Sequence, residues 1–307
     1  MFITGAAGFG GSHLAAALLE RCYRVTGLDV TPPSRAGLLR GALLNECFRY
    51  LWKSVQDVRT EDIEGHAVVV HLAAQADAPL AFESPRYTIM QNIDGTVALL
   101  EAVRRAQSVS KVLFAGSGNE IGRARYTPID EEHPLTPHNP YGFSKAAAEM
   151  ALEAWRLAYG VPSVVMRSGV VVGPNMRQEV FLFRWLRNAL HGKPIVVEGG
   201  KQTRDLAFID DVVRAWMLVI EAPVELVVGE KFFVGSGEEY AIEELAEMCR
   251  DAVGSDAPIE YAAYRPGEEG HREAFSIEKA RRVLGYAPRV SPKEAVALTA
   301  EWVRAVG

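Results

Sequence analysis

The sequence is poor in cysteine, in long apolar runs and in positive charge. Its three cysteines, Cys22, Cys47 and Cys249, match neither a disulfide framework nor a metal site in their spacing. The apolar run at 67–74 is too short to span a membrane. A net charge of -6 gives no electrostatic reason to bind nucleic acid or an anionic membrane. The chain opens on a strand pattern rather than a secretory signal. We therefore expect a cytoplasmic protein with no nucleic-acid partner, no membrane partner and no metal.

Short apolar runs alternate with helical patterns over residues 1–172. This alternation predicts parallel strands joined by right-handed crossovers, with helices on both faces. The expected fold class is therefore α/β, a Rossmann-type doubly wound parallel sheet. We expect strands at 1–4, 24–29, 67–72, 111–115 and 163–167, a weaker strand near 47–51, and helices at 9–21, 95–107 and 141–159. The helices at 95–107 and 141–159 have apolar faces broad enough to serve the core and also a homodimer.

The pattern changes after Gly173 and Pro174. Residues 174–205 are rich in Arg, Asn and Gly, and 206–221 return to a strand followed by a helix. Beyond these we expect a strand at 231–234 and helices at 241–253, near 276–284 and at 292–304. The predicted domains are a Rossmann domain of 1–173 with 206–230, and a smaller discontinuous α/β domain of 174–205 with 231–307. Ligands of doubly wound sheets bind at the carboxyl ends of the strands, where a second domain can cover them.

The first residues, MFITGAAGFGGSHL, predict a strand, a glycine turn and the start of a helix. Gly5, Gly8 and Gly11 supply the tight turn, the close backbone approach and the close packing of helix on strand that a dinucleotide site requires. A helix that begins near Phe9 points its free N–H groups at the pyrophosphate. The pattern favours a dinucleotide site, although a glycine turn without a ligand would look the same.

Asp29 ends the second predicted strand, where a carboxylate can accept hydrogen bonds from the adenosine ribose. A carboxylate there repels a 2′-phosphate, which favours NAD over NADP; Arg35 is the one nearby residue that argues the other way. The small residues of HLAAQA (71–76) let a flat cofactor lie against the backbone, or else reflect tight packing.

Tyr141 and Lys145 open a predicted helix and lie four residues apart, on one face. An ammonium group near a phenol favours the phenolate, so Tyr141 becomes an acid/base usable near neutral pH. Ser117 stands at the carboxyl end of the strand at 111–115, where it can hydrogen-bond the same substrate oxygen. An exposed Tyr–Lys contact and an ordinary turn serine are the alternatives.

These stretches follow one another in a familiar order. The glycine turn, Asp29, HLAAQA, Asn92-Ile-Asp-Gly-Thr96, the strand with Ser117, and PYGFSK resemble the extended short-chain dehydrogenases/reductases, in particular their NAD-dependent sugar epimerase/dehydratase family. Further stretches that resemble motifs of this family lie at 199–215, 232–246, 264–270 and 284–296. The resemblance covers essentially the whole chain.

The resemblance assigns roles to individual residues. It implies a catalytic trio of Ser117, Tyr141 and Lys145, in which Tyr141 takes a proton from a sugar hydroxyl while hydride passes to NAD. The cofactor residues that it implies are Gly5, Gly8, Phe9, Gly11, Asp29, Asp57, Val58, Leu72, Ala73, Ala74, Asn92, Tyr141 and Lys145. The substrate residues that it implies are Gln75, Asn119, Asn175, Arg204 and Arg265.

The chain departs from the family at two places. Dehydratases and decarboxylases of the family carry a Glu two residues after the catalytic Ser or Thr, whereas this chain has Asn119, with Glu120 one residue later. Many members that bind nucleotide sugars have an Asn where this chain has Val170, and Asn175 follows further on. Arg204 and Arg265 match arginines that clamp a pyrophosphate, or else form ion pairs within the protein.

We therefore predict an NAD-dependent nucleotide-sugar epimerase, acting as a 4-epimerase of a UDP-hexose through a transient keto sugar. The alternatives are an NAD-dependent dehydrogenase or reductase of a sugar or other hydroxy compound, and a nucleotide-sugar dehydratase. A non-catalytic dinucleotide-binding regulator would not need the acid/base trio of Ser117, Tyr141 and Lys145.

Overall fold

The computed structural model describes residues 1–306, apart from the side chain of Ala78. The chain divides into two compact units, each assembled from segments that lie far apart in the sequence. Unit 1 comprises Met1–Glu120, Asn139–Arg167 and Val213–Phe232. Unit 2 comprises Ile121–His138, Ser168–Val212 and the chain from Phe233 onward.

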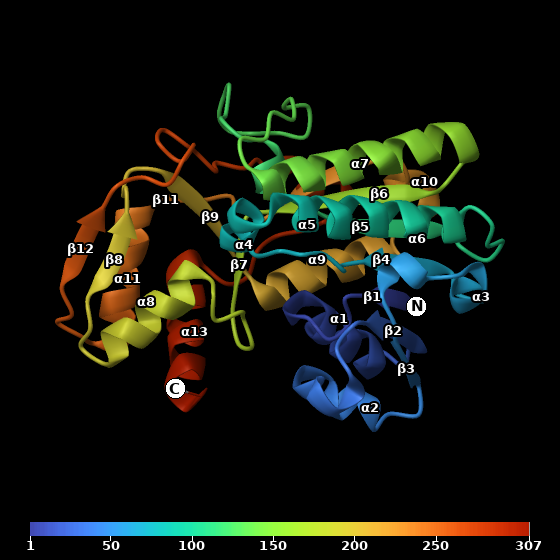
Figure 1. The fold of residues 1–307 in the computed structure, drawn as a ribbon, viewed down its shortest axis with the longest axis horizontal. Helices are drawn as coiled ribbons and strands as arrows, with labels where there is room; N and C mark the ends of the chain where they lie inside the picture. Colours follow the sequence, from blue (N-terminus) through green and yellow to red (C-terminus); the bar gives the residue numbers. More distant parts are fainter. Residues whose placement is uncertain (307) are drawn as a thin grey trace. The chain divides into compact units, whose positions relative to one another are not determined.

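A seven-stranded sheet in the order β10-β6-β5-β4-β1-β2-β3 forms the centre of unit 1 (Figure 1). Its strands are β1 (Phe2–Thr4), β2 (Val25–Asp29), β3 (Phe48–Trp52), β4 (Val68–His71), β5 (Lys111–Ser117), β6 (Ser163–Ser168) and β10 (Lys231–Val234). The pairs β1–β2, β1–β4, β2–β3 and β4–β5 are parallel. The chain runs outward from β1 to β3 and then returns to β4 on the other side of β1. The strand order therefore reverses between β1 and β4, which is where such sheets bind ligands.

Helices cover both faces of this sheet. Figure 1 shows α6 and α7 on one face and α1 and α9 on the other. The helices of unit 1 are α1 (Phe9–Glu20), α2 (Arg40–Leu43), α3 (Thr60–Ile63), α4 (Ala78–Glu83), α5 (Pro85–Ile89), α6 (Gly95–Val103), α7 (Pro140–Tyr159) and α10 (Val224–Val227), with a π-helical turn η4 (Met90–Asp94) and 3₁₀ turns η1 (Pro33–Arg35), η2 (Gly37–Leu39), η3 (Val55–Asp57) and η5 (Gly118–Glu120). Helix α9 (Ile209–Glu221) begins in unit 2 and ends in unit 1.

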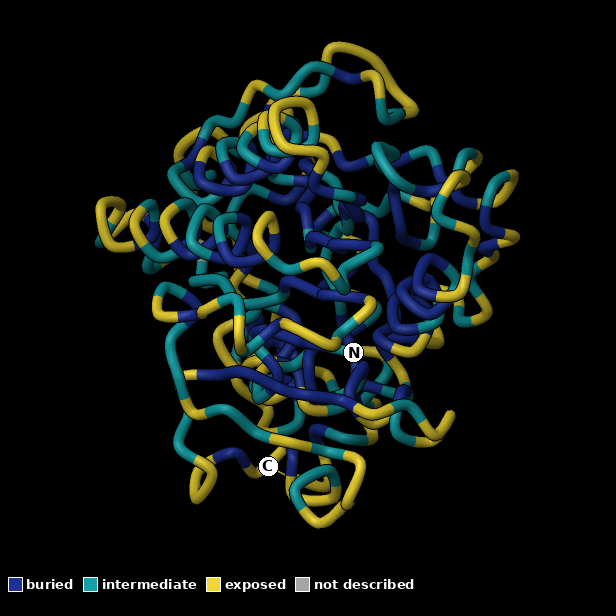
Figure 2. Tube along the Cα trace, turned by 90° about the vertical axis from the view of Figure 1, so that its right-hand side faces the viewer, coloured by how far each residue is buried: buried dark blue, intermediate teal, exposed yellow. Residues whose placement is uncertain are grey.

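The core of unit 1 explains the apolar runs of the sequence. Strands β1 and β4 are buried along their whole length because helices cover both of their faces. Phe2, Val69, Leu99, Val112 and Val165 belong to one cluster of buried side chains that joins the sheet to its helices. In Figure 2 the buried chain is dark blue, while the yellow, exposed residues lie mainly at turns and on outer faces.

A buried lysine closes the end of α9. Lys111 begins β5, and its Nζ donates hydrogen bonds to the carbonyl oxygens of Val219 at 3.0 Å and Ile220 at 2.6 Å, and also to that of Ala222. The last carbonyls of a helix have no partner within the helix, so one ammonium group satisfies three of them. Hydrogen bonds from a charged ammonium group thereby connect strand β5 to the end of helix α9.

Unit 2 contains two small sheets. A three-stranded sheet has the order β11-β9-β7, in which β9 pairs antiparallel with β11 and parallel with β7, and β8 and β12 form a parallel pair. The elements of unit 2 are β7 (Val170–Val172), α8 (Phe181–Leu190), β8 (Ile195–Glu198), β9 (Thr203–Phe208), β11 (Glu239–Ala241), α11 (Ile242–Val253), β12 (Ile259–Ala262), α12 (Glu278–Leu284) and α13 (Pro292–Val306). The stacked rings of Phe233 and Phe275, 4.6 Å apart, pack with Ile121 and Ile129 in a small core of unit 2.

Within residues 1–306, no helix is both long and apolar enough to cross a membrane.

The glycine turn after β1 depends on close backbone packing. Gly5 has φ +71°, and a Cβ on it would lie 2.7 Å from the backbone nitrogen of Ala73, which follows β4. A Cβ on Gly11 would lie 2.1 Å from the carbonyl oxygen of Gly5. A Cβ on the neighbouring Gly10 would meet no atom within 4 Å, so this position tolerates a side chain. Gly5 and Gly11 are therefore required by geometry, and Gly10 is not.

Gly11→Ala and Gly10→Ala form a matched pair that tests this packing. We expect Gly11→Ala to lower the free energy of unfolding by about 1–3 kcal/mol, because the new Cβ must displace backbone atoms. Gly10→Ala should raise it by up to about 1 kcal/mol, because alanine favours the helix. Thermal unfolding beside the wild type measures both effects, and equal midpoints for the two variants would contradict the close packing at Gly11.

Candidate active site

The N-terminus of α1 suits a diphosphate group. Gly8 is the N-cap residue, it makes no side-chain capping bond, and the first turn of the helix carries no acidic residue. The first backbone N–H groups of a helix have no partner within it and carry a partial positive charge, so they favour an anion. Phe9, Gly11 and the buried Ala6 belong to the same turn. Gly11 has no side chain where the backbone of the turn packs most closely.

Asp29 lies beside the glycine turn. One oxygen of its carboxylate accepts a hydrogen bond from the backbone N–H of Ala7 at 3.0 Å, and the other accepts from that of Thr31 at 2.9 Å. The residue is 8% exposed and stands at the end of β2. The structure thus places the predicted ribose-binding carboxylate directly against the predicted diphosphate turn.

A buried histidine joins β1, β4 and α6. His71 is 3% exposed; its Nδ1 is 2.7 Å from Thr4 Oγ1 and its Nε2 is 3.0 Å from Thr96 Oγ1. Thr96 donates its proton to the carbonyl of Asn92, and Thr4 accepts one from the N–H of Ala73. His71 therefore donates through Nε2 and accepts at Nδ1. Burial, reinforced by the charge of a nearby lysine, lowers the pKa of His71 to about 3, so its ring is neutral.

Asn92 occupies the wide turn η4 and fixes the chain after β4. Its Oδ1 accepts a hydrogen bond from the backbone N–H of Gln75 at 2.7 Å, and its Nδ2 donates to the carbonyl of Gln75 and to Ser144 Oγ on α7. The Gln75 side chain is itself held at both ends, by Thr88 and by the carbonyl of Asp77. Asn92 therefore ties the residues after β4 to helix α7.

A chain of amide hydrogen bonds joins Ser117 to α7. Ser117 Oγ accepts from the backbone N–H of Asn119 at 3.2 Å. Asn119 Oδ1 in turn accepts from Asn139 Nδ2 at 3.1 Å, and Asn139 is the N-cap of α7, accepting from the N–H of Gly142 at 2.7 Å. The end of β5 is thus tied to the first turn of the helix that carries Tyr141.

Lys145 is buried on the same face of α7 as Tyr141. Its ammonium group lies 4.4 Å from the ring centre of Phe114, and the residue is 4% exposed. Burial lowers the pKa of Lys145 to about 8, although the Glu120 carboxyl group acts in the opposite direction. At neutral pH the group is therefore still mainly an ammonium, available to stabilise a phenolate.

Unit 2 contains the two arginines predicted to bind substrate. Arg204 on β9 pairs with Glu268 and lies 3.5 Å from a Glu273 carboxylate oxygen. Arg265 pairs with Glu198. Asn175 is exposed and has φ +68°, a left-handed conformation that asparagine tolerates in turns.

The other predicted cofactor residues follow β4 or lie in the turn η3 after β3. Leu72, Ala73 and Ala74 follow β4 directly, and Ala73 is fixed through Thr4 as described. Asp57 is exposed and ends the turn η3, and Val58 next to it is buried. Among residues 1–306, no group of three or more His, Cys, Asp or Glu side chains is arranged to hold a metal ion.

Comparison with known proteins places this site in a family. Residues 1–235 match the model of the NAD dependent epimerase/dehydratase family. The chain belongs to this family. The UDP-glucose 4-epimerase of Mycolicibacterium smegmatis is 33% identical over 98% of this chain and 97% of its own. The dTDP-glucose 4,6-dehydratase of Streptomyces niveus is 29% identical over 99% and 92%.

Solved structures agree. The UDP-glucuronic acid 4-epimerase of Bacillus cereus, solved with UDP-glucuronic acid and NAD, aligns with a TM-score of 0.93 at 27% identity, covering 100% of this chain and 99% of that one. The UDP-glucose 4-epimerase of Thermotoga maritima, solved with UDP-glucose, aligns with a TM-score of 0.88 at 29% identity over 99% and 98%. The predicted Rossmann-type α/β fold and the predicted family are confirmed, and this family member is an NAD-dependent enzyme.

His71 and Asn139 hold predicted residues in place but were not among the predicted site residues. His71 was the readable signal, because it is the one titratable residue in the apolar run AVVVHLAA. Asn139 was visible as an N-cap before a proline. The partners of His71 on β1 and α6 could not be found, because they are distant in sequence.

The pH dependence of stability reports on His71. An ordinary histidine binds a proton near pH 6.5, whereas folded His71 does so only near pH 3. The unfolded chain therefore binds more protons below pH 6.5, and this group lowers the free energy of unfolding by up to about 1.4 kcal/mol per pH unit on acidification. The stability of His71→Gln should fall less steeply between pH 6.5 and about pH 4.

Urea unfolding of wild type and variant across this range measures the slopes. Exposed His191 supplies the control, since His191→Gln should keep the wild-type slope. Parallel curves for wild type and His71→Gln would contradict a neutral, buried His71.

Proposed function

We propose that this protein is an NAD-dependent nucleotide-sugar 4-epimerase acting on a UDP-hexose. The observation that carries the proposal is the hydrogen-bonded connection from Ser117 through Asn119 and Asn139 to the helix of Tyr141 and Lys145. This connection fixes Ser117 relative to the helix of Tyr141 and Lys145. At Asn119 it uses a carboxamide where family dehydratases carry a glutamate. The named relatives that act on UDP-sugars as 4-epimerases support the same choice.

Unit 1 would hold the cofactor. The N–H groups of the first turn of α1, from Phe9 onward, would bind the diphosphate, Asp29 the adenosine ribose, and Lys145 the nicotinamide ribose. The small residues after β4 leave room for a flat ring against the backbone. When bound, NAD supplies hydride acceptance from a carbinol carbon and its return.

Tyr141 would act as the acid/base. The Lys145 ammonium lies on the same face of α7 and stabilises the phenolate, which takes the proton of the substrate hydroxyl and later gives it back. Ser117 Oγ accepts a hydrogen bond from Asn119, so its own proton can be donated to the same substrate oxygen. These two groups would hold the substrate oxygen in place both as a hydroxyl and, after the hydride and the proton have left, as a ketone oxygen.

Asn119 argues against elimination of water. A carboxamide cannot transfer the proton that dehydration requires, and both of its ends are engaged, with Ser117 and Asn139. Glu120 cannot supply this proton transfer instead, because its side chain is fully buried. We therefore favour epimerisation over dehydration.

Unit 2 would bind the nucleotide sugar. Arg204 and Arg265 carry guanidinium groups that match a diphosphate, and each now pairs with a carboxylate that a diphosphate would replace. Asn175 of unit 2 and Gln75 of unit 1 remain predicted substrate residues. We accordingly assign cofactor binding to unit 1 and nucleotide-sugar binding to unit 2.

The cellular setting and the oligomer are also proposals. Cys22 and Cys47 are exposed free thiols, which fits a reducing cytoplasm. Phe143, Met150 and Leu157 are spaced seven residues apart on α7, and Met150 and Leu157 are 67% and 70% exposed. Helices α6 and α7 lie side by side in Figure 1 and contact each other. We propose that a second copy of the chain covers this apolar stripe, because a two-fold dimer pairs one patch with itself.

Incubation of the enzyme with a panel of nucleotide sugars tests the function. We expect a UDP-hexose to equilibrate with its C4 epimer without net change in nicotinamide absorbance. Tyr141→Phe should lower kcat by about 10²- to 10⁴-fold, because the general acid/base is lost, and should leave NAD affinity nearly unchanged. Stoichiometric reduction of NAD would indicate a dehydrogenase, and a 4-keto-6-deoxy product would indicate a dehydratase. Near-normal turnover by Tyr141→Phe would remove Tyr141 from the mechanism.

Sedimentation of a charged variant tests the dimer. Wild type should sediment as a dimer and the double variant Met150→Glu/Leu157→Glu as a monomer, because two buried carboxylates per chain would cost more than the contact provides. Leu44 is 84% exposed outside the stripe, so Leu44→Glu should remain dimeric. A monomeric wild type would contradict the proposal.

A further inference from the structure

Glu120 is a fully buried carboxyl group directly behind Ser117. Its side chain has no exposed surface, and one of its oxygens, Oε1, accepts a hydrogen bond from the backbone N–H of Ser117 at 2.7 Å. The turn η5 that contains Glu120 folds the side chain back under the end of β5. Two hydrogen bonds therefore hold Ser117: its Oγ accepts from the N–H of Asn119, and its own N–H donates to Glu120.

A buried ion pair anchors this carboxyl group. Oε2 of Glu120 lies 3.4 Å from Arg167 Nε, and Arg167 is 1% exposed. The guanidinium of Arg167 donates to both oxygens of Glu149, from Nε at 3.0 Å and from Nη2 at 2.7 Å. Such a bidentate pair is rigid, so the Arg167 guanidinium next to Glu120 has a fixed position.

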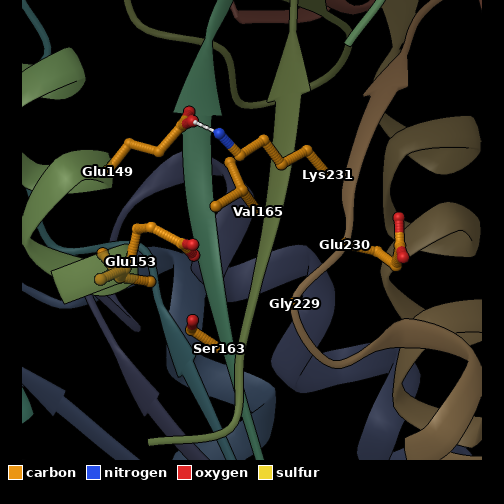
Figure 3. Close-up of a pocket in the computed structure, with 8 residues that line it drawn as sticks. Glu149, Glu153, Ser163, Val165, Gly229, Glu230 and Lys231 are labelled. Carbon is orange, nitrogen blue, oxygen red and sulfur yellow. Dashed lines mark ion pairs between the residues drawn. The ribbon is translucent and has the colours of Figure 1, made fainter. Parts of the chain in front are cut away.

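The network ends at the surface of unit 1. Figure 3 shows Glu149 of α7 and Lys231 of β10 directed at each other, with their charged groups 2.8 Å apart, in a hollow lined also by Ser163 and Val165 of β6. Lys231 is the partly exposed member of the set, with 35% of its side chain accessible. Strands β5, β6 and β10 and helix α7 are thus connected behind Ser117.

Burial disfavours the charged form of Glu120. Burial raises the pKa of Glu120 well above its usual range, and the neighbouring Glu149 carboxylate raises it further. Glu149, in contrast, has a lowered pKa, because the hydrogen bonds from Arg167 and Glu120 outweigh the effect of its burial. The charged form is therefore favoured at Glu149 and disfavoured at Glu120, while Glu120 accepts from the Ser117 amide.

The strand leaves room for this arrangement. A Cβ on Gly116 would lie 3.0 Å from Arg167 Cγ and 3.2 Å from Glu120 Oε1. The glycine before Ser117 thus lets Arg167 and Glu120 pack against the backbone of β5.

We propose that Glu120 is a positioning residue of the reaction: its buried carboxyl group holds the amide of Ser117 and so fixes the Ser117 hydroxyl against the substrate oxygen. The inference rests on the proposed function, since it needs Ser117 to touch the substrate. It assigns Glu120 no proton transfer with the sugar.

Two substitutions separate positioning from charge. Glu120→Leu removes the acceptor for the Ser117 amide and should lower kcat on the order of 10²-fold, the size of effect that a displaced catalytic group produces. The KM and the NAD affinity should stay within about threefold, because neither depends on this amide. Glu120→Gln keeps a carbonyl that can accept from the Ser117 amide, and should keep kcat within about threefold of wild type.

The matched control is Glu153→Leu. Glu153 lies one turn after Glu149 on α7 and lines the same hollow as Glu149 and Lys231, so its loss should leave kcat unchanged. All rates are divided by the concentration of NAD-binding sites, so that partial unfolding does not count as loss of turnover. Wild-type kcat in Glu120→Leu, or an equal loss in Glu120→Gln, would overturn the inference.

Ser117→Ala shows whether a negative result counts against the positioning role of Glu120 or against the proposed role of Ser117. If it loses turnover while Glu120→Leu does not, the positioning role fails and the proposed function stands. If it keeps turnover, the proposed role of Ser117 fails and the inference falls with it. Should Glu120→Leu not fold, hydrogen exchange of the Ser117 amide in the wild-type enzyme decides instead: strong protection supports the bond to Glu120, and exchange as fast as in an open loop overturns it.

Discussion

The hydrogen bond that Asn139 donates to Asn119 is the interaction on which the candidate site depends. Ser117 ends a strand, whereas Tyr141 and Lys145 begin a helix that follows a long excursion of the chain through unit 2. Nothing in the local sequence relates the two. The side chain that caps α7 also holds the turn after β5, so the start of the helix and the end of the strand share one fixed point. Catalytic geometry here is a consequence of helix capping.

Several buried polar groups around this fixed point have partners. His71 is neutral and uses both ring nitrogens, and Lys145 loses part of its preference for a proton through burial. Arg167 and Glu149 neutralise each other. Each group would be costly alone, because a buried charge or an unsatisfied donor is expensive. Together they make the carboxyl ends of β4 and β5 stiff, which is what a site that must orient a single hydroxyl group requires.

The sequence predicted the strands of unit 1, because parallel strands buried on both faces appear as continuous apolar runs. It also predicted α1, α6, α7 and the helix of 206–221, but not the short helices α2, α3, α4, α5 and α10. It also singled out Ser117, Tyr141 and Asp29 as candidate site residues, since each stands at a strand or helix end; their roles stay predictions. It did not predict α8 or the strands β7 and β8, all within 170–198. The strands have three or four residues, too few to show a period, and α8 mixes aromatic residues with arginines. The supporting role of Glu120 was invisible for a different reason: its partners, Arg167 and Glu149, reach it only through the fold.

The wide turn η4 has a consequence for insertions and deletions. A π-helical turn holds one residue more than an α-helical turn, so the residues after it are rotated relative to those before. Asn92 faces Ser144 and Gln75 from within this turn, and Thr96 meets His71 just beyond it. Deleting a single residue from Met90–Asp94 would restore the α-helical repeat and rotate one contact set away from the other by about 100°, which is one residue's share of a helical turn. The chain length between β4 and α6 is therefore fixed as strictly as the identity of any residue in the site.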